Sequence, residues 1–550
     1  MSLDEVRGDQ PLRERKSIGF LAISLTAVFT FGAFPTAASP DLSLWWMIWF
    51  SHVPLLWWIR DRSPQSGFWW SYLCGAMINT GGYYWISELI QTFGHLPQPL
   101  PLIGLFLHSA LVGLIWGVWG WLVCALSARW GRMLIVPSAM IAAEFMMPRI
   151  FEAHMGDSQY PVVVVMQIAD LFGVAAVTGL IYTVNAALAE AVERKFKPLI
   201  YAGGLVALSL VYGVVRMAQI DEISAQSRSL KIGLVEGDVG IFEAEPRQKK
   251  RDHLLIQQKL SAELVAQGAE LIVWPESSFR AAGIPMALTS FYRSDVPLVD
   301  HAEEDVQRGT DQRDQLTPLR GFRAPLLFGA NGMGMKEVEG GQAGQKRRVY
   351  YNRAWLLSES GQVLGTYDKV HRLVFGEYIP LGDMFPIFYQ WLPSASRTER
   401  GEGVKSLVLP TEKGEVRLGM LNCYEGIIPA FNRELLSTDP DVLINLTNDD
   451  WFASTAERYL HFALALPRSI ESRRYYLRAT LTGVSAVVDA NGRILKWTST
   501  EEAETLLHDV PLMRTWTLYA QIGDLLPYGT LIWLMYALWD RRREQVQLIT

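Results

Sequence analysis

The first 216 residues of the chain alternate between long apolar stretches and short polar loops. Each apolar stretch is near the length of about 20 residues that a helix needs to cross the hydrocarbon core of a membrane. An eighth stretch, with the run YGTLIWLMYALW, follows a long polar interval. The expected spans are 17–36, 42–59, 67–88, 100–126, 132–149, 162–191, 198–216 and 519–540. The pattern therefore predicts a seven-span membrane domain over residues 1–216, and a closing transmembrane helix with a basic tail over residues 519–550.

Basic residues in the loops predict the orientation of these spans. Loops that stay in the cytoplasm keep Lys and Arg, whereas translocated loops avoid them. Loops 37–41 and 89–99 contain neither residue, and loop 150–161 has only Arg149 at its border. The other loops and the tails carry Arg7, Arg13, Arg15, Lys16, Arg60, Arg62, Arg129, Arg132, Arg194, Lys195, Lys197, Arg541, Arg542 and Arg543. This alternation predicts cytoplasmic termini and an extracytoplasmic domain over residues 217–518.

Residues 217–518 have a different periodicity. Short apolar or β-branched runs alternate with helical segments, such as 248–268, and this pattern is typical of an α/β domain. The expected strands are KIGLVEG (231–237), LIVW (271–274), PLLFGAN (325–331), AWLLS (354–358), VRLGMLNC (416–423), DVLINLT (441–447) and GVSAVVDA (483–490). The stretch GANGMGM (329–335) lacks the third glycine of a dinucleotide-binding fingerprint, so we interpret it as a strand end and a turn.

Composition excludes several classes of protein. Half of the residues are apolar and 19% are charged, which is unusual for a soluble protein. The net charge of −6, with neither a basic stripe nor a P-loop, argues against a nucleic-acid partner. Two of the three cysteines, Cys74 and Cys124, lie in apolar runs, and no CxxC pair exists for a metal. We therefore expect a free thiol at Cys423 and no metal or cofactor.

Three ionisable residues end or closely follow apolar runs of this domain: Glu276 after LIVWP, Lys369 after VLGTYD and Cys423 after VRLGMLN. Ligands of open α/β sheets bind beyond the carboxyl ends of strands, where all three are expected. Taken singly, Glu276 could be a carboxylate at a helix N-terminus, Lys369 a surface lysine and Cys423 a small core residue.

Together, the same three residues suit acyl transfer. A thiol has a pKa of about 8.5 and needs a base or a cation beside it to attack at neutral pH. Cys423 would be the nucleophile, and Glu276 would accept and return the proton. Lys369 would stabilise the oxyanion of the tetrahedral intermediate.

Four motifs resemble those of the nitrilase superfamily of carbon-nitrogen hydrolases. They are WPESS (274–278), YDKVHRLVFGEYIP (367–380), NCYEG (422–426) and TNDDWF (447–452). With the flanking spans, nearly the whole chain resembles the membrane branch of that superfamily, the apolipoprotein N-acyltransferases. This resemblance implies a nitrilase-like αββα sandwich for the extracytoplasmic domain.

The resemblance also implies roles for single residues. Glu276, Lys369 and Cys423 match the Glu-Lys-Cys catalytic triad of the family, and Glu377 of FGEY would support the site. The residues that would line the substrate pocket are Tyr424, Glu425, Asn448, Trp451 and Phe452. From the sequence alone, Trp451 and Phe452 could equally be core aromatics.

The reaction implied by the resemblance moves an acyl chain from a membrane phospholipid to Cys423 as a thioester. The chain then passes to the α-amine of the diacylglyceryl cysteine that begins an apolipoprotein, at the inner membrane of a bacterium. No cofactor is implied, and the partners are the two lipid substrates and the bilayer. Because lifting each CH₂ into water costs about 0.8 kcal/mol, the site should open toward the membrane.

Two other functions fit parts of the sequence. A membrane-tethered amidase would use the same three residues with water as the acceptor, and a scaffold would carry an inactive nitrilase domain. Eight spans are an elaborate anchor for an enzyme with a water-soluble substrate, and the intact triad residues argue against a scaffold.

Overall fold

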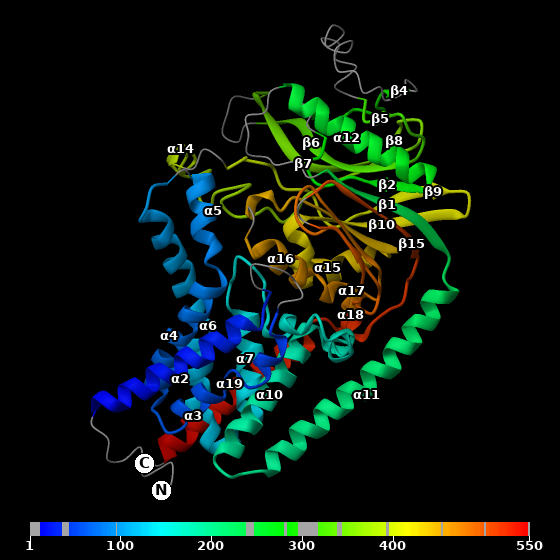
Figure 1. Ribbon diagram of the computed structural model, residues 1–550. Coiled ribbons are helices and arrows are strands. Elements are labelled where there is room, and N and C mark those ends of the chain that lie inside the picture. The colour runs from blue at the N-terminus through cyan, green and yellow to red at the C-terminus, as the bar shows by residue number, and fades with distance from the viewer. Residues whose placement is uncertain are drawn as a thin grey trace. The chain divides into compact units, whose positions relative to one another are not determined.

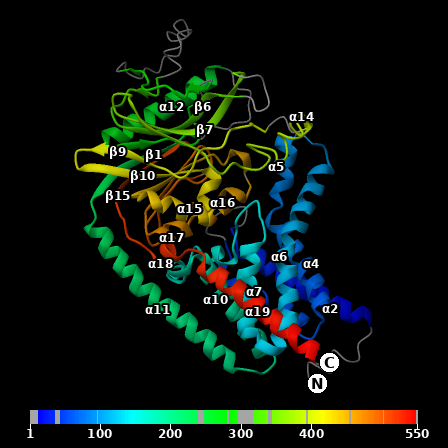
Figure 2. The same ribbon diagram turned by 180° about the vertical axis from the view of Figure 1, so that it is seen from behind.

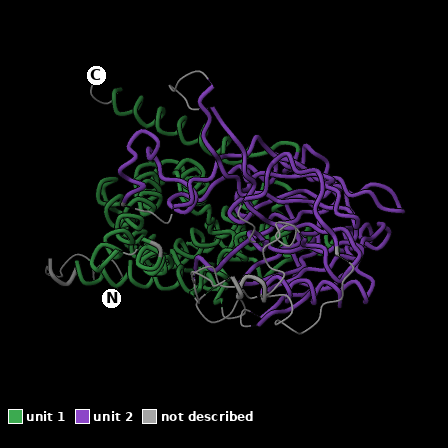
Figure 3. The backbone as a smooth tube through the Cα atoms, turned by 90° about the horizontal axis from the view of Figure 1, so that it is seen from above, with its two compact units in different colours: residues 1–217, 455–467, 521–550 green, residues 218–454, 468–520 purple. Residues whose placement is uncertain are grey.

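The computed structural model of the protein describes residues 12–35, 43–94, 96–237, 247–279, 283–294, 317–337, 344–391, 395–452, 455–499 and 502–547. The chain forms two compact units, which Figure 3 colours separately. Unit 1 contains residues 1–217, 455–467 and 521–550, and unit 2 contains residues 218–454 and 468–520. The first division follows residue 217, beside the change of periodicity in the sequence, whereas residues 455–467 join unit 1 from within the α/β region.

Unit 1 is helical. Its N-terminal helices are α2 (Leu12–Gly32), η2 (Trp45–Trp49), α3 (Val53–Ile59), α4 (Pro64–Gly82), α5 (Trp85–Gly94), α6 (Leu100–Trp130) and α7 (Arg132–Met146). The others are η3 (Met155–Gln159), α8 (Val163–Met166), α9 (Ala169–Phe172), α10 (Val174–Val192), α16 (Glu457–Ala465), α19 (Leu525–Gln547) and most of α11 (Lys197–Gln226). Figures 1 and 2 label the longer of these helices, such as α4, α6, α10, α11 and α19.

Small residues allow α4 and α6 to pack closely. A Cβ atom at Gly120 would lie 2.1 Å from Ser71 Oγ, and one at Gly113 would lie 3.0 Å from Ala76 N. Small residues at a helix interface let two backbones approach in this way, which is a common means of packing helices in membranes. The sequence of α4 also fixes its start, because Ser63 Oγ accepts a hydrogen bond from Ser66 N and proline occupies the first helical position.

Three described helices are long and apolar enough to cross a membrane: α6, α10 and α11. The expected spans 42–59 and 67–88 are each divided between two helices, η2 with α3 and α4 with α5. Helix α11 exposes most of its apolar side chains, as a lipid-facing helix would; Ile200 is 76% exposed and Leu208 is 65% exposed. Helix length therefore supports membrane insertion, and the number of crossings stays a prediction.

Unit 2 contains two large β-sheets. The first has the order β15-β1-β2-β6-β7-β8, with β3 beside β6, and the second has the order β14-β13-β12-β11-β10-β9. The strands of the first sheet are β1 (Ser229–Glu236), β2 (Leu271–Val273), β3 (Ile284–Pro285), β6 (Leu326–Glu337), β7 (Lys346–Leu357), β8 (Val363–Asp368) and β15 (Glu504–Pro511). The second contains β9 (Ser406–Thr411), β10 (Gly414–Asn422), β11 (Val442–Thr447), β12 (Tyr476–Thr480), β13 (Ala486–Val488) and β14 (Ile494–Trp497). Strands β4 (Arg293–Ser294) and β5 (Leu319–Arg320) form a separate pair.

Helices cover the outer faces of the two sheets. Figures 1 and 2 show α12 (Arg247–Ala266) on the first sheet, and α15 (Pro429–Leu435) and α17 (Pro467–Ser472) on the second. The first sheet and α12 enclose an apolar core that includes Trp274, Phe328 and Trp355. All seven expected strands and the expected helix are confirmed, with shifted ends.

The interpretation of GANGMGM as a strand end and a turn was wrong. Strand β6 continues through this stretch and pairs with β7 from Leu326 opposite Leu357 to Glu337 opposite Lys346. The glycine at 329 instead allows a close approach of two backbones, because a Cβ atom there would lie 2.6 Å from the Cα atom of Glu276. The glycine therefore helps to position a candidate catalytic residue.

Candidate active site

The structure places Glu276, Lys369 and Cys423 just beyond the carboxyl ends of β2, β8 and β10. All three side chains are buried. Lys369 Nζ lies 3.2 Å from Glu276 Oε1, and both charged groups influence the thiol of Cys423 electrostatically. Strands from both sheets thus bring the three residues together at one site.

Two carboxylates hold the ammonium of Lys369. Glu377 Oε2 lies 2.9 Å from Lys369 Nζ on one side, and Glu276 Oε1 lies on the other. Glu377 is itself fixed, because its Oε2 accepts a hydrogen bond of 2.8 Å from Leu373 N. Burial by itself lowers the pKa of Lys369, but the two carboxylates outweigh burial and raise the pKa well above its usual range. The lysine therefore stays charged beside the thiol.

Asn352 is a site residue that the sequence analysis missed. Its Nδ2 donates to Glu276 Oε1 at 2.5 Å and to Glu377 Oε1 at 2.8 Å, while its Oδ1 accepts from Asn422 Nδ2 at 3.0 Å. Asn422 immediately precedes Cys423. A chain of hydrogen bonds therefore joins the turn that carries Cys423 to the carboxylates of Glu276 and Glu377. The sequence contains one signal for this role. Asn352 is a polar residue just before the expected strand AWLLS, at a position where a buried side chain is normally apolar.

We expect Asn352→Ala to slow acylation of Cys423 by roughly 10- to 100-fold, because two buried carboxylates lose a donor and Glu276 loses its orientation. Single-turnover acylation would measure this loss. Asn331→Ala in the neighbouring strand β6 is a matched control, because Asn331 is paired with Asn352 in register and has an exposed side chain. An equal loss in both variants would contradict the assigned role of Asn352.

The turn that carries Cys423 has a strained backbone. Cys423 has a φ of +52°, in the left-handed region that residues other than glycine rarely adopt. Such strain costs on the order of 1–3 kcal/mol and persists where the surrounding structure enforces it. Here the enforcing group is Glu425, whose Oε2 accepts a hydrogen bond of 2.8 Å from Asn422 N.

Glu425 also ties this turn to the loop that carries Lys369. Its carboxylate accepts hydrogen bonds from Tyr367 Oη at 2.6 Å, Val370 N at 2.6 Å and His371 N at 2.9 Å. Burial raises the pKa of Glu425 to about 7, although these donors favour the charged form. Glu425 thus links two loops by hydrogen bonds. Its expected contact with substrate stays a prediction.

The resting thiol is neutral. Burial, followed by the charge of Glu276, raises the pKa of Cys423 to about 12, and Lys369 only partly opposes them. Burial also raises the pKa of Glu276, against the effect of Lys369. Within the described part of the chain, Glu276 Oε1 accepts hydrogen bonds from Asn352 Nδ2 and Lys369 Nζ, whereas the buried Oε2 has no hydrogen-bond partner. Oε2 is therefore the atom that is free to accept a proton.

The other expected pocket residues lie close to Cys423 in the sequence or at the end of β11, the neighbour of β10. Tyr424 and Trp451 are half-buried, and Phe452 is buried in the short helix η7 (Asp450–Phe452). Asn448 is buried, and its Oδ1 accepts a hydrogen bond of 3.0 Å from Asp450 N. Their contact with a substrate stays a prediction. Among the described residues, no group of three or more His, Cys, Asp or Glu side chains could hold a metal ion.

Comparison with known proteins assigns both parts of the chain. Residues 31–187 match the family model of the apolipoprotein N-acyltransferase N-terminal domain, and residues 329–518 match that of carbon-nitrogen hydrolases. The apolipoprotein N-acyltransferase of Geobacter metallireducens is 26% identical over 93% of this chain and 92% of its own length. That of Bdellovibrio bacteriovorus is 27% identical over 82% of this chain and 81% of its own length.

Solved structures also resemble part of the chain. An amidase from Nesterenkonia sp. is 20% identical over 52% of this chain and 92% of its own, with a TM-score of 0.32. The two family models and the relatives that span most of the chain lead to one assignment. The chain belongs to the apolipoprotein N-acyltransferase family, within the carbon-nitrogen hydrolase superfamily.

Proposed function

We propose that this protein transfers an acyl chain from a membrane phospholipid to the α-amine of the diacylglyceryl cysteine of an apolipoprotein, with Glu276, Lys369 and Cys423 as its triad. The main support for this proposal is the buried ammonium of Lys369, which lies between the carboxylates of Glu276 and Glu377 and influences the buried thiol of Cys423. The relatives named apolipoprotein N-acyltransferase support the choice of substrates. They do not favour an amidase that uses water as the acceptor.

In the first half-reaction, the sulfur of Cys423 attacks an ester carbonyl of the phospholipid while Glu276 Oε2 takes the thiol proton. The carbonyl oxygen becomes an oxyanion, which the ammonium of Lys369 stabilises. The C–O bond to the glycerol then breaks, and Glu276 returns the proton to the leaving oxygen. The products are a thioester on Cys423 and a lysophospholipid.

In the second half-reaction, the α-amine of the acceptor attacks the thioester carbonyl and gives a proton to Glu276. The C–S bond breaks as the amide forms, and the proton returns to the sulfur of Cys423. The pKa of about 12 that burial gives the thiol favours this return, because a thiolate in the same place would be poorly stabilised. Both half-reactions therefore use the same base and the same cation.

The two half-reactions predict a ping-pong pattern. Phospholipid alone should convert the purified protein into a stable thioester at Cys423, detectable by mass spectrometry as an added acyl chain. A diacylglyceryl peptide with a free N-terminal amine should then remove the adduct and gain the chain. The same peptide with an acetylated amine is the control and should leave the adduct in place. Release of the chain to water at one rate with or without the free amine would favour a hydrolase instead.

We also propose seven spans over residues 1–216, a catalytic domain over residues 217–518 outside the cytoplasm, and a closing span in residues 519–550. The alternating basic loops support this arrangement. A phosphatase reporter that is active only outside the cytoplasm should be active when fused after residue 361, in a turn between β7 and β8, and inactive when fused after the C-terminus. The reverse pattern would contradict the proposed side of the membrane.

A further inference from the structure

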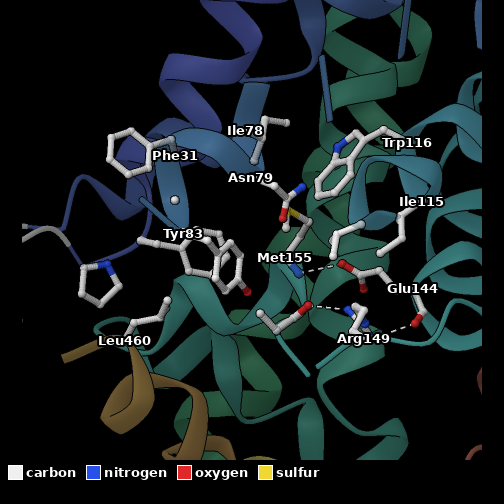
Figure 4. A pocket seen from close by; sticks show the side chains of 15 residues that line it. Phe31, Ile78, Asn79, Tyr83, Ile115, Trp116, Glu144, Arg149, Met155 and Leu460 are labelled. Atoms are coloured by element: carbon white, nitrogen blue, oxygen red, sulfur yellow. Dashed lines mark hydrogen bonds between the residues drawn. The ribbon is translucent and has the colours of Figure 1, made fainter. Parts of the chain in front are cut away.

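Both units contain buried polar groups, and in unit 1 the protein itself satisfies those of a small pocket. Figure 4 shows this pocket, whose volume of about 60 Å³ is well below the roughly 300–1,000 Å³ of a typical ligand pocket. Glu144 there accepts hydrogen bonds from Met155 N at 2.8 Å and from Thr178 Oγ1 at 3.1 Å. Arg149 donates to the carbonyl oxygens of Glu144 and Ala153. These groups therefore hold the fold of unit 1 together.

Thr447 of unit 2 is different, because its hydroxyl is buried and unpaired. It is the last residue of β11 and the first of the motif TNDDWF, and its side chain has no exposed surface. Within the described part of the chain, Thr447 Oγ1 has no nitrogen or oxygen partner. Buried hydroxyls nearly always have a partner, because an unpaired donor keeps the full cost of leaving water. An exception at this point is typical of a group that acts during a reaction.

The second sheet places Thr447 beside the nucleophile. Strands β10 and β11 are parallel, with Asn422 opposite Leu446. Cys423 and Thr447 are the next residues along these two neighbouring strands. Side chains alternate between the faces of a strand, so Asn445 and Thr447 lie on the same face of β11. Asn445 Nδ2 donates a hydrogen bond of 3.2 Å to Cys423 O, so this is the face that meets the turn of Cys423.

The electrostatic surroundings of the thiol agree with this placement. Burial raises the pKa of Cys423 most, and the carboxylates of Glu276 and Asp449 raise it further. Lys369 and the hydroxyl of Thr447 lower this pKa. The three charged groups already take part in ion pairs, at 3.2 Å between Lys369 and Glu276 and at 2.5 Å between Asp449 and an arginine of β12. The hydroxyl, by contrast, can turn its hydrogen toward the sulfur without breaking another bond.

We propose that Thr447 is a further catalytic residue, whose hydroxyl donates a hydrogen bond to the sulfur of Cys423 whenever that sulfur carries negative charge. This role rests on the proposed function, since it takes Cys423 as the nucleophile. In the first half-reaction, the donor acts as the thiol proton passes to Glu276 Oε2. In the second, the electron pair of the breaking C–S bond moves to the sulfur, and Thr447 stabilises it until Glu276 returns the proton. The hydroxyl keeps its own proton throughout, because it is far harder to deprotonate than a thiol.

A neutral donor at the sulfur complements the cation of Lys369. Negative charge lies on the sulfur before the attack and after the C–S bond breaks, and on the carbonyl oxygen between these moments. Lys369 can therefore remain directed at the oxyanion while Thr447 serves the sulfur. Because a neutral donor stabilises an anion less than a second cation would, the sulfur still takes its proton back at the end of the cycle.

Thr447→Val tests this role, because valine keeps the shape of the side chain and removes the donor. Alkylation of Cys423 by iodoacetamide, followed by mass spectrometry of its peptide from the full-length protein in detergent micelles, reports the reactivity of the sulfur without any lipid. Thr447→Val should slow this alkylation by roughly 10- to 100-fold at a given pH, since a hydrogen bond to a charged group contributes such a factor. Its pH dependence should move to higher pH, because loss of the donor raises the pKa of the thiol. Thr447→Ser keeps a hydroxyl and should retain most of the rate.

Thermal unfolding separates this role from a structural one. Thr447→Val removes an unpaired hydroxyl, so its melting temperature should equal or exceed that of the wild type. Thr480→Val is the matched control, because Thr480 lies opposite Thr447 in β12, is equally buried, and has its Oγ1 at 3.0 Å from Ser485 Oγ. This control should lower the melting temperature and leave the alkylation rate of Cys423 near that of the wild type.

The outcomes distinguish the role of Thr447 from the proposed function. An unchanged alkylation rate in Thr447→Val, an equal loss in Thr480→Val, or a loss in Thr447→Ser as large as in Thr447→Val would overturn the role. A fall in the melting temperature of Thr447→Val as large as that of Thr480→Val would also overturn it. If alkylation follows the expected pattern while phospholipid gives no acyl-enzyme in the wild type, the proposed function fails and the hydrogen bond to the sulfur stands.

Discussion

Replacing Cys423 with alanine should abolish both the acyl-enzyme and the acylated product. No other group at the site can carry the chain, and loss of a nucleophile of this kind lowers the rate by roughly 10⁴-fold or more. Cys423→Ser should be nearly as inactive, because a buried hydroxyl is far harder to deprotonate than the thiol. Intact-protein mass spectrometry after incubation with phospholipid would measure the adduct.

Another cysteine provides the control for this experiment. Cys124 lies in α6 and donates to Ile59 O at 3.2 Å, and Cys124→Ser keeps a donor at that position. We expect this variant to form the acyl-enzyme at the normal rate. An acyl adduct in Cys423→Ala, or loss of the adduct in Cys124→Ser alone, would show that the nucleophile has been assigned wrongly.

Glu276→Gln should slow acylation by roughly 10²- to 10⁴-fold, because it keeps the shape of the side chain and removes the proton acceptor. The pH profile should separate this role from a structural one. Burial raises the pKa of Glu276 above its usual range, so the active, deprotonated form is present above that pKa and acylation is lost as the pH falls through it. The acid limb should therefore lie at a higher pH than that of an exposed glutamate, and Glu276→Gln should lack it.

Glu236→Gln is a close control for that substitution. Glu236 is also a buried carboxyl at the end of a strand of the same sheet, and burial raises its pKa to about 8. It is thus mostly protonated at neutral pH and resembles glutamine in charge. We expect Glu236→Gln to keep the acid limb of the acylation profile, and loss of the limb in this variant would assign the titration to the wrong residue.

Local patterns were sufficient to predict β2 and β10, the strands that place Glu276 and Cys423, whereas β8, which places Lys369, was not among the expected strands. Glu276, Lys369 and Cys423 each follow a short apolar run, and the run alone indicates where the strand ends. Asn352 could not be found in this way, since its role depends on pairing between β7 and elements distant in sequence. The glycines of β6 were interpreted wrongly for a related reason. The sequence shows that glycine allows many backbone conformations, but it does not show that the backbone of Glu276 packs against Gly329 and leaves no room for a side chain there.

Elements whose stability comes from tertiary contacts were also missed. Strand β12 contains Arg478, which reads as a surface residue, yet its side chain is buried and pairs with Asp449 at 2.5 Å. The apolar runs of the membrane region predicted helices well and their breaks poorly. The break between η2 and α3 occurs inside a continuous apolar stretch, where His52 N donates a hydrogen bond of 2.9 Å to Asn185 Oδ1 of α10.

The carboxylate of Glu425 has a consequence for motion at the site. It accepts the backbone N–H groups of Asn422, Val370 and His371, which belong to two loops from different sheets. Neither loop can open without breaking bonds that the other shares, so the two should fluctuate as one cooperative unit. Their amide protons would then exchange with solvent on a common timescale, and the nucleophile and its cation would become mobile together.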